Sequence, residues 1–337
     1  MAGETTQTLK YKGFLKGHGG WVTSIAVGEE KRADDKTVEF LLTGSRDRNL
    51  IKWELDEKKD DDEDREWGRP KKLLSGHSHF ISQVCLTQDH RFAFSSSWDG
   101  TIRIWNLATG TTHQQLIGHK KDVLSFDISH MNHIVSGSLD TQIKLWNVNG
   151  ECKSTFDRNT HTDAVSCVKF YNGNKQPLLV TASWDKTIKV WDASYYGQLI
   201  YNFTGHKAQI NSIDMVQNSS YLASGSRDGT TMVWDLINGK FLTSYDCESP
   251  VNVVLFSQKL YWLIIGTDEG IKVLDLPSRS ILQNIQETSM NANDIQQGSK
   301  KHLGCTALAW NKSGNIIYSG WTDNNIRVYK LESAEQQ

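Results

Sequence analysis

Histidine, aspartate and serine or threonine, the residue types of a catalytic triad, recur along this chain of 337 residues. In a hydrolase with such a triad, the histidine takes a proton from the serine hydroxyl and the aspartate orients the imidazole ring. One set here comprises His119, Ser125 and Asp140. An enzyme needs a single site, however, and the aspartate of this pattern returns seven times. The recurrence therefore favours a structural role, and we expect no enzymatic activity.

Each aspartate is followed six residues later by a tryptophan or another apolar anchor. The seven pairs are Asp47/Trp53, Asp99/Trp105, Asp140/Trp146, Asp185/Trp191, Asp228/Trp234, Asp268/Leu274 and Asp323/Tyr329. The residues between them are mostly β-branched or apolar with a basic residue interleaved, which is typical of a strand that follows a tight turn. Because the spacing is constant while the loops between copies vary, the pattern predicts one rigid turn-and-strand unit per copy.

Successive anchors lie 40 to 55 residues apart, and a Gly-His or Thr-His pair precedes five of the copies. The five histidines are His18, His77, His119, His161 and His206. A period near 40 to 45 residues with a Gly-His start and a Trp-Asp end is the signature of a four-stranded propeller blade. Over essentially its whole length, the chain resembles the WD-repeat family.

The resemblance implies a hydrogen-bond network in each complete copy. A buried tryptophan needs a partner for its indole N–H, because an unpaired buried donor costs about 1–3 kcal/mol. In the family, the histidine, a hydroxyl and the turn aspartate complete this network. The expected members are His18, Asp47, Trp53, His77, Asp99, Trp105, His119, Ser125, Asp140, Trp146, His161, Asp185, Trp191, His206, Asp228 and Trp234.

The last two copies depart from the pattern. The sixth lacks both the histidine and the tryptophan, and the seventh has Tyr329 with only His302 as a displaced candidate. We expect these two blades to depend more on packing.

The repeats predict an all-β, seven-bladed propeller that spans residues 1–337 as one domain. The blades are expected at approximately residues 16–55, 75–108, 117–149, 159–193, 204–237, 246–276 and 302–331. A further strand, residues 8–15, precedes the first blade. In propellers such a strand usually completes the last blade, which closes the ring and leaves no open sheet edge.

Composition excludes several classes of function. The net charge is −2, with 37 basic and 39 acidic residues, so the overall charge of the protein does not attract nucleic acid. The chain has no apolar run of eighteen residues, and residues 1–12 lack the apolar core of a signal peptide. Its five cysteines are scattered without a Cys-x-x-Cys pair, which favours reduced thiols. We expect a cytoplasmic protein without membrane insertion, metal, cofactor or small-molecule substrate.

Two stretches are expected to form loops. Residues 56–66 are densely charged and predominantly acidic, and such a stretch stays solvated. Residues 283–301 are polar and rich in asparagine and glutamine. Long loops on rigid scaffolds often carry partner contacts.

The residues just before the turn aspartates form a candidate partner-binding face: Arg46, Trp98, Leu139, Trp184, Arg227, Thr267 and Trp321. We expect them to encircle one mouth of the central channel. Tryptophan and arginine are enriched in the hot spots of protein interfaces. The alternative, in which individual tryptophans pack against neighbouring blades, stays open.

A basic cluster is confined to blade one and its neighbours. Arg46 and Arg48 flank the first turn aspartate, and Arg69, Lys71 and Lys72 lead into the second blade. In a chain of balanced charge, this group is a candidate site for phosphate contacts.

Several segments resemble one family more closely than a general WD repeat. They are GHGGWVTSIA, GHSHFISQV, SWDGTIRIWNLATGT, GHKKDVLSFDIS, VSGSLDTQIKLWN, VSCVKF and YWL. In them the chain resembles the receptor for activated C kinase family, also described as G-protein β-subunit-like proteins, over about residues 8–330. The resemblance implies a non-enzymatic scaffold on the head of the small ribosomal subunit. Such a scaffold contacts rRNA and ribosomal proteins, and it docks protein kinase C-type kinases and other signalling proteins linked to translation.

In that family, a basic–Asp–basic turn in the first blade contacts rRNA. The matching residues here are Arg46, Asp47 and Arg48. The resemblance thus implies rRNA binding by Arg46 and Arg48, with Lys72 as a helper, and a cytoplasmic, ribosome-associated protein. The acidic loop, which we expect next to this patch, departs from the family pattern.

Two other classes compete with this interpretation. A heterotrimeric G-protein β subunit would need a helical N-terminal extension to pair with a γ chain, and about seven residues precede the first expected strand. A free cytosolic WD-repeat adaptor is the main alternative, since the fold alone does not fix function.

Overall fold

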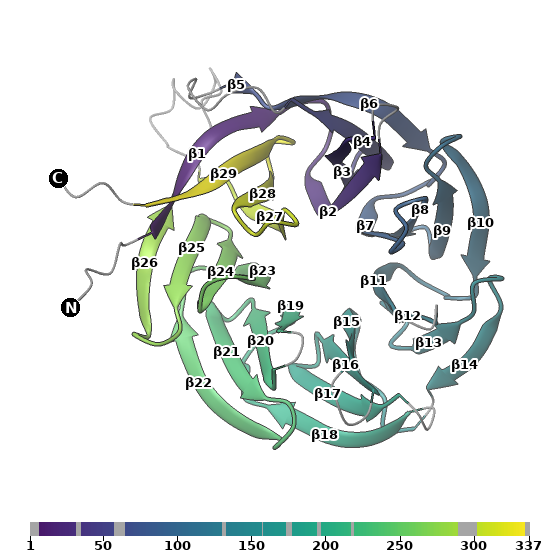
Figure 1. Cartoon of the computed structure of the whole chain (residues 1–337). Coiled ribbons are helices and arrows are strands. Elements are labelled where there is room, and N and C mark those ends of the chain that lie inside the picture. Colours follow the sequence, from purple (N-terminus) through teal and green to yellow (C-terminus); the bar gives the residue numbers. More distant parts are fainter. Residues whose placement is uncertain are drawn as a thin grey trace, which may run out of the picture.

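The computed structural model describes residues 7–31, 35–56, 65–129, 133–156, 158–172, 177–193, 197–216, 219–288 and 302–333. All regular elements in these ranges are strands, and they form seven twisted sheets around a central channel (Figure 1). The predicted all-β, seven-bladed propeller is therefore confirmed. Most of the two expected loops, residues 57–64 and 289–301, lies outside the described residues.

Each blade is an antiparallel sheet whose strands follow one another from the channel to the rim. Blade one comprises β2 (Val22–Lys31), β3 (Thr37–Ser45), β4 (Asn49–Leu55) and β6 (Gly68–Ser75). Blade two comprises β7 (Ile81–Leu86), β8 (Phe92–Ser97), β9 (Thr101–Asn106) and β10 (Thr111–Ile117). Blade three comprises β11 (Val123–Ile128), β12 (Ile134–Ser138), β13 (Ile143–Trp146) and β14 (Cys152–Phe156). Blade four comprises β15 (Val165–Asn172), β16 (Pro177–Ser183), β17 (Thr187–Asp192) and β18 (Gln198–Thr204).

The remaining blades follow the same plan. Blade five comprises β19 (Ile210–Met215), β20 (Tyr221–Ser226), β21 (Thr230–Asp235) and β22 (Lys240–Asp246). Blade six comprises β23 (Val251–Phe256), β24 (Trp262–Thr267), β25 (Gly270–Asp275) and β26 (Ser280–Ile285). Blade seven comprises β27 (Cys305–Trp310), β28 (Ile316–Trp321), β29 (Ile326–Ser333) and β1 (Gln7–Leu15), with a short added strand, β5 (Arg65–Glu66).

The ranges expected for the first six blades contain three strands each, and the fourth, outermost strand follows them in the chain. In blade two, for example, β10 starts at Thr111, after the expected end at residue 108. The outer strand lies at the rim and is largely exposed or partly buried. It therefore carries neither the aspartate nor the buried anchor that marks the repeat.

The second strand of each blade is the most buried, because neighbouring sheets cover both of its faces. All five residues of β12 and all six of β24 are buried. Such strands are continuous runs of small and apolar residues rather than alternating ones. The anchor side chains of the third strands lie between the sheets, and four of the five tryptophan anchors expose at most 1% of their surface: Trp53, Trp105, Trp146 and Trp191.

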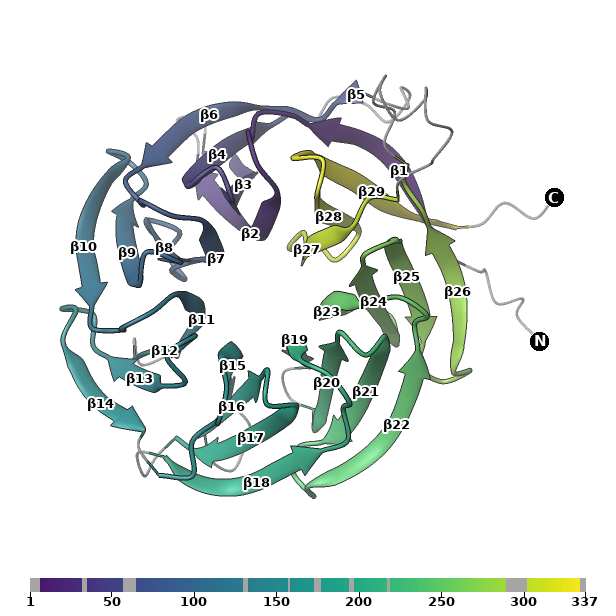
Figure 2. The ribbon, with the colours of Figure 1, turned by 180° about the vertical axis from the view of Figure 1, so that it is seen from behind.

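The N-terminal strand closes the ring. β1 pairs antiparallel with β29, from Gln7 opposite Ser333 to Leu15 opposite Ile326 (Figure 2). β5 then adds to β1 in parallel, with Gly13 opposite Arg65. Gly13 has a φ of 148°, and a Cβ there would lie 2.3 Å from the carbonyl oxygen of Arg65, so this approach requires glycine.

The acidic insertion is anchored at its base, away from the first turn. The N–H of Asp56 donates to the carbonyl of Trp67 at 2.9 Å. The N–H of Trp67 donates to the carbonyl of Phe14 at 2.8 Å. Asp56 follows the end of β4, whereas the Arg46–Arg48 turn precedes its start. The length of β4 therefore separates the base of the loop from the Arg46–Arg48 turn.

Candidate functional site

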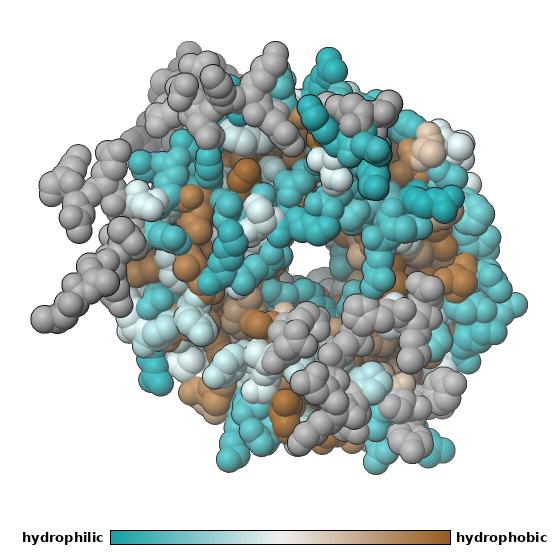
Figure 3. All heavy atoms as spheres, in the orientation of Figure 1, coloured by the Kyte–Doolittle hydropathy of each residue, from teal (hydrophilic) through white to brown (hydrophobic). Residues whose placement is uncertain are grey.

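Polar bonds link the blades around the channel, which Figure 3 shows as an opening at the centre of the ring. At six blade boundaries, the second residue of the innermost strand donates to a carbonyl of the next blade. The bonds run from Thr23 to Ile81 (2.6 Å), Ser82 to Val123 (2.6 Å), Ser166 to Ile210 (2.6 Å), Asn211 to Val251 (2.8 Å), Asn252 to Cys305 (3.2 Å) and Thr306 to Val22 (2.5 Å). Leu124 occupies the equivalent place at the boundary between blades three and four.

One face of the ring, which we call the turn face, carries the turns between the second and third strands. The loops with the histidines lie on the same face, because each turn is bonded to the loop before its blade. In blade one, the N–H of Arg46 donates to the carbonyl of Trp21 at 2.9 Å. The equivalent donors in the other blades are Trp98, Leu139, Trp184, Arg227, Asp268 and Thr322. This series fixes which residues occupy equivalent places around the ring.

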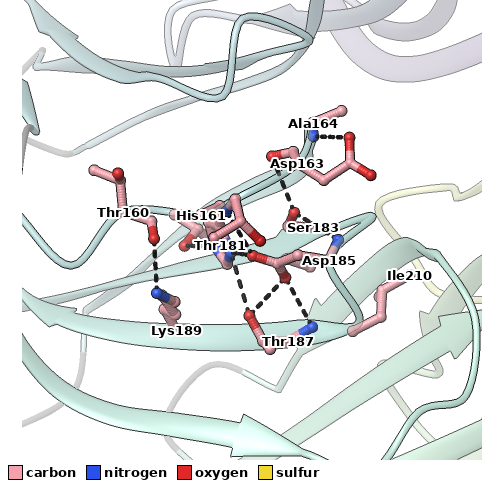
Figure 4. Close-up of polar contacts among 12 residues, drawn as sticks. Thr160, His161, Asp163, Ala164, Thr181, Ser183, Asp185, Thr187, Lys189 and Ile210 are labelled. Carbon is pink, nitrogen blue, oxygen red and sulfur yellow. Dashed lines mark hydrogen bonds and ion pairs between the residues drawn. The ribbon is translucent and has the colours of Figure 1, made fainter.

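Blade four contains a complete copy of the network, and Figure 4 shows its histidine, aspartate and hydroxyl groups. Nδ1 of His161 lies 2.8 Å from Oδ2 of Asp185, and its Nε2 lies 2.8 Å from Oγ1 of Thr181. The indole N–H of Trp191 donates to the same Oγ1 at 2.9 Å. The hydroxyl of Thr187 donates to Asp185 at 2.7 Å. The turn, the loop and two strands of the blade are thus tied together.

The first, second, third and fifth blades contain the same arrangement. Their His–Asp distances are 2.7, 2.7, 2.9 and 3.1 Å, and their indole–hydroxyl distances are 2.8, 2.7, 2.8 and 2.9 Å. The histidine and tryptophan side chains are nearly or fully excluded from solvent. Because each hydroxyl already binds an indole and an imidazole, it is not available as a nucleophile.

The structure corrects one member of the network. The hydroxyl that binds His119 and Trp146 belongs to Ser136 on β12, at 2.7 and 2.8 Å, and not to Ser125. Ser125 lies on the innermost strand β11, where its hydroxyl binds Gln83 of blade two and the backbone N–H of blade four's Val168.

A sequence signal identifies the correct hydroxyl. It lies four residues before the aspartate and ten before the tryptophan in all five copies: Thr43, Ser95, Ser136, Thr181 and Ser224.

The network keeps its aspartates ionised. Burial raises the pKa of Asp140, but the hydrogen bonds from His119 and from the backbone N–H of Lys120 outweigh it and lower the pKa to about 2. Asp228 behaves in the same way, with a pKa of about 2. Burial lowers the pKa of its partner His206. These groups therefore form a fixed polar scaffold rather than an acid–base pair near neutral pH.

Among the described residues, blades six and seven lack the histidine network, and blade six has a shorter turn than the other blades. The turn between β24 and β25 contains two residues, Asp268 and Glu269, and that between β28 and β29 contains four. In blade seven, Arg327 binds Asp323 at 2.8 Å, so an ion pair stands in for the histidine. His302 is exposed and forms a backbone bridge with Thr288.

Five of the seven residues expected on the partner-binding face lie on the turn face. Arg227 is exposed there, and the other four are half-buried: Arg46, Trp98, Leu139 and Trp184. The expectation is wrong for Thr267 and Trp321, because both side chains are fully buried at strand ends.

The two errors have different causes. The shorter turn of blade six places Asp268 at the exposed position. In blade seven the residue directly before Asp323 is Thr322, and Trp321 is the last residue of β28. Thr267 donates to the carbonyl of Gly270, and the indole of Trp321 donates to Ser319 at 2.7 Å.

The first turn presents two arginines. Arg48 is exposed, with a φ of 72°, and within the described part of the chain its side chain has no hydrogen-bond or ion-pair partner. Burial lowers the pKa of Arg46, which packs against Trp21. Arginine keeps its charge in proteins, so both side chains can attract phosphate.

Lys72 does not belong to this group. It lies on β6 opposite Lys52, and its ammonium donates to the carbonyls of Leu107 (3.3 Å) and Ala108 (2.6 Å). Those carbonyls follow the end of β9 that is distant from the turn face. The expectation that Lys72 assists the arginines is therefore not met, because strand direction carries its side chain away from them.

Within the described ranges, no helix has the length and apolar character needed to cross a membrane. No cluster of three or more metal-ligating side chains occurs in the same ranges. All five cysteines are described, and all are free thiols.

Comparison with known proteins agrees with the repeat pattern. Six segments match the model of the WD domain, G-beta repeat: residues 9–54, 68–106, 110–147, 150–192, 197–235 and 295–330. The unmatched stretch between residues 235 and 295 contains blade six, whose turn and anchor are atypical.

Two relatives match over nearly their whole length. The Cross-pathway control WD-repeat protein 2 of Flammulina velutipes is 40% identical over 326 residues, which cover 96% of this chain and 98% of the relative. The Small ribosomal subunit protein RACK1 of Drosophila melanogaster is 38% identical over 327 residues, which cover 97% of this chain and 98% of the relative.

Proposed function

Because the chain belongs to the WD-repeat family and, within it, to the group that includes RACK1, we propose that it is a non-enzymatic scaffold bound to the small ribosomal subunit. The observation that carries this proposal is the full-length similarity to a protein named as a small ribosomal subunit protein. The same similarity favours a ribosome-associated, cytoplasmic location. It does not favour a free adaptor or a G-protein β-like subunit.

We infer that Arg46 and Arg48 form the rRNA contact. Both lie on the turn face of blade one, and neither has a carboxylate partner among the described residues. Nucleic-acid phosphates are bound chiefly by such unpaired cations, with an affinity that falls as salt rises. By contrast, the nearby Arg69 and Lys71 bind Glu54 and Glu30.

Signalling kinases and other partners would dock on four turn-face residues of blades two to five, of which Arg227 is exposed and the other three are half-buried: Trp98, Leu139, Trp184 and Arg227. The side chains are of the types that dominate protein interfaces. Blade four lies across the ring from blade one (Figure 1). A partner centred on Trp184 would therefore leave the Arg46–Arg48 turn free for the ribosome, as a scaffold requires.

Sedimentation tests the proposal. Lysates of the source cells are run on sucrose gradients with wild-type protein, with Arg46→Asp/Arg48→Glu, and with the control Arg91→Asp/Lys240→Glu. The control changes the net charge equally at exposed sites away from the turn face. We expect wild type and control to travel with small subunits and the first variant to stay at the top. Wild type at the top would refute ribosome binding, whereas co-sedimentation of both variants would refute the named contact.

A further inference from the structure

Five side chains of blades one and two form a continuous stack on the turn face, which we call the arginine stack: Trp21, Arg46, Phe80, Trp98 and His79. The guanidinium carbon of Arg46 lies 3.7 Å from the ring centroid of Trp21 and 5.6 Å from that of Phe80. The Phe80 and Trp98 centroids are 5.3 Å apart. His79 lies nearly parallel to Trp98, at 5.6 Å and 19°.

Backbone bonds hold the stack in place. Arg46 donates its N–H to the carbonyl of Trp21, and Trp98 donates to that of Phe80, both at 2.9 Å. The N–H of Phe80 donates to Nδ1 of His79 at 2.8 Å, which orients that ring beside Phe80. These bonds fix the backbone that carries the stack, and the rings lie against Arg46 without a ligand.

Arg46 differs from other cations that lie over rings in this protein. Arg327 lies 4.8 Å from the ring of Trp321 but also binds Asp323. Lys52 lies 4.2 Å from the ring of Phe40 but also binds Glu30. For the Arg46 guanidinium, the described part of the chain offers ring contacts and no hydrogen-bond acceptor. Its N–H donors are thus available to an external acceptor.

We propose that Trp21 and Phe80 are positioning residues for Arg46, and that the arginine stack is a preformed receptor for one phosphate of folded RNA. A guanidinium stacked on a ring keeps its in-plane N–H edge open, and that edge matches the two oxygens of a phosphate. Fixing the side chain in advance removes the entropy loss that a mobile arginine incurs on binding.

The two arginines then have different tasks. Arg48 is exposed and supplies charge without fixed geometry, whereas Arg46 supplies a fixed geometry. This inference rests on the proposed function, because it names the ligand that the same site binds.

The test measures binding of labelled protein to purified small subunits that lack it, over a series of KCl concentrations. The variants are Trp21→Leu, Phe80→Leu, Arg46→Gln and Trp21→Leu/Arg46→Gln. We expect the two ring variants to weaken binding about three- to ten-fold. Arg46→Gln should also reduce the salt slope by about one. In the Arg46→Gln background, Trp21→Leu should have no further effect.

Two controls separate positioning from general damage. Tyr261→Leu removes an exposed aromatic ring of blade six, between β23 and β24, and should bind like wild type. Trp21→Phe keeps an aromatic ring under Arg46 and should restore most of the affinity.

The outcomes distinguish this inference from the proposed function. If wild type does not bind small subunits, both fail. If wild type binds and Trp21→Leu binds equally well, the positioning role alone is refuted. It is also refuted if Trp21→Leu weakens binding equally with and without Arg46, since Trp21 would then act independently of the arginine.

Discussion

The hydroxyl of Ser136 accepts the indole N–H of Trp146 at 2.8 Å while it also binds His119 at 2.7 Å. One small side chain thus satisfies two buried rings that come from different elements of blade three. The same geometry in five blades explains why a period of about 40 residues is so visible in the sequence. It also shows that the histidine, aspartate and hydroxyl are used for stability.

Replacing this hydroxyl should destabilise the protein. Ser136→Ala leaves the indole N–H of Trp146 and a ring nitrogen of His119 without their partner in a buried site. We expect the free energy of unfolding to fall by about 1–3 kcal/mol. Denaturant unfolding measures it, with Ser78→Ala, an exposed serine of blade two, as the control. Equal stability of the two variants would contradict the role of Ser136.

Stability should fall in acid because of the turn aspartates. The pKa of Asp140 is about 2 in the folded protein against an ordinary value of 3.8. The folded state therefore binds protons less readily than the unfolded chain. This contribution is complete above about pH 4 and is lost as the pH falls towards 2. Chemical unfolding at pH 5, 4, 3 and 2 should show a smaller loss for Asp140→Asn than for wild type; parallel curves would contradict the linkage.

Removing the N-terminal strand should destabilise the whole ring. Deleting residues 1–15 removes the partner of β29 and the fully buried side chains of Leu9 and Leu15. It also leaves an open strand edge, which promotes aggregation. We expect a much lower thermal midpoint and rapid proteolysis. A chain that starts at Gln7 keeps β1 whole and serves as the control; equal midpoints for the two deletions would contradict the closure.

The bond between blades seven and one offers a finer test of ring closure. The hydroxyl of Thr306 donates to the carbonyls of Val22 (2.5 Å) and Gly320 (3.1 Å). Thr306→Val keeps the shape and removes the donor, so we expect a loss of about 1 kcal/mol in unfolding free energy. Thermal unfolding of the two proteins checks this. An unchanged midpoint would show that this contact does not hold the boundary.

The sequence predicts the fold well because each repeat has the same spacing between its aspartate and its anchor. The Asp-to-anchor spacing fixes a turn and a strand, and in blades one to five it also locates the buried tryptophan. Positions on the turn face are less predictable. Thr267 is buried because the two-residue turn of blade six shifts the register, and Trp321 is buried because Thr322 directly precedes Asp323 and occupies the turn position.

The repeat pattern alone does not predict the contacts of every residue. Ser125 binds residues of blades two and four, whereas Ser136, four residues before its aspartate, binds the tryptophan of its own blade. Lys72 adjoins the basic cluster in sequence, yet its strand carries it to the other end of the blade. The arginine stack combines residues from four loops and turns of two blades, so no single motif predicts it.

Electron cryomicroscopy of small ribosomal subunits isolated from the source cells tests the central claim most directly. The account predicts density for a seven-bladed ring on the subunit, with Arg46 and Arg48 of blade one against rRNA phosphates and Trp184 of blade four facing solvent. Subunits without the ring, or a ring whose first blade points away from rRNA, would contradict it.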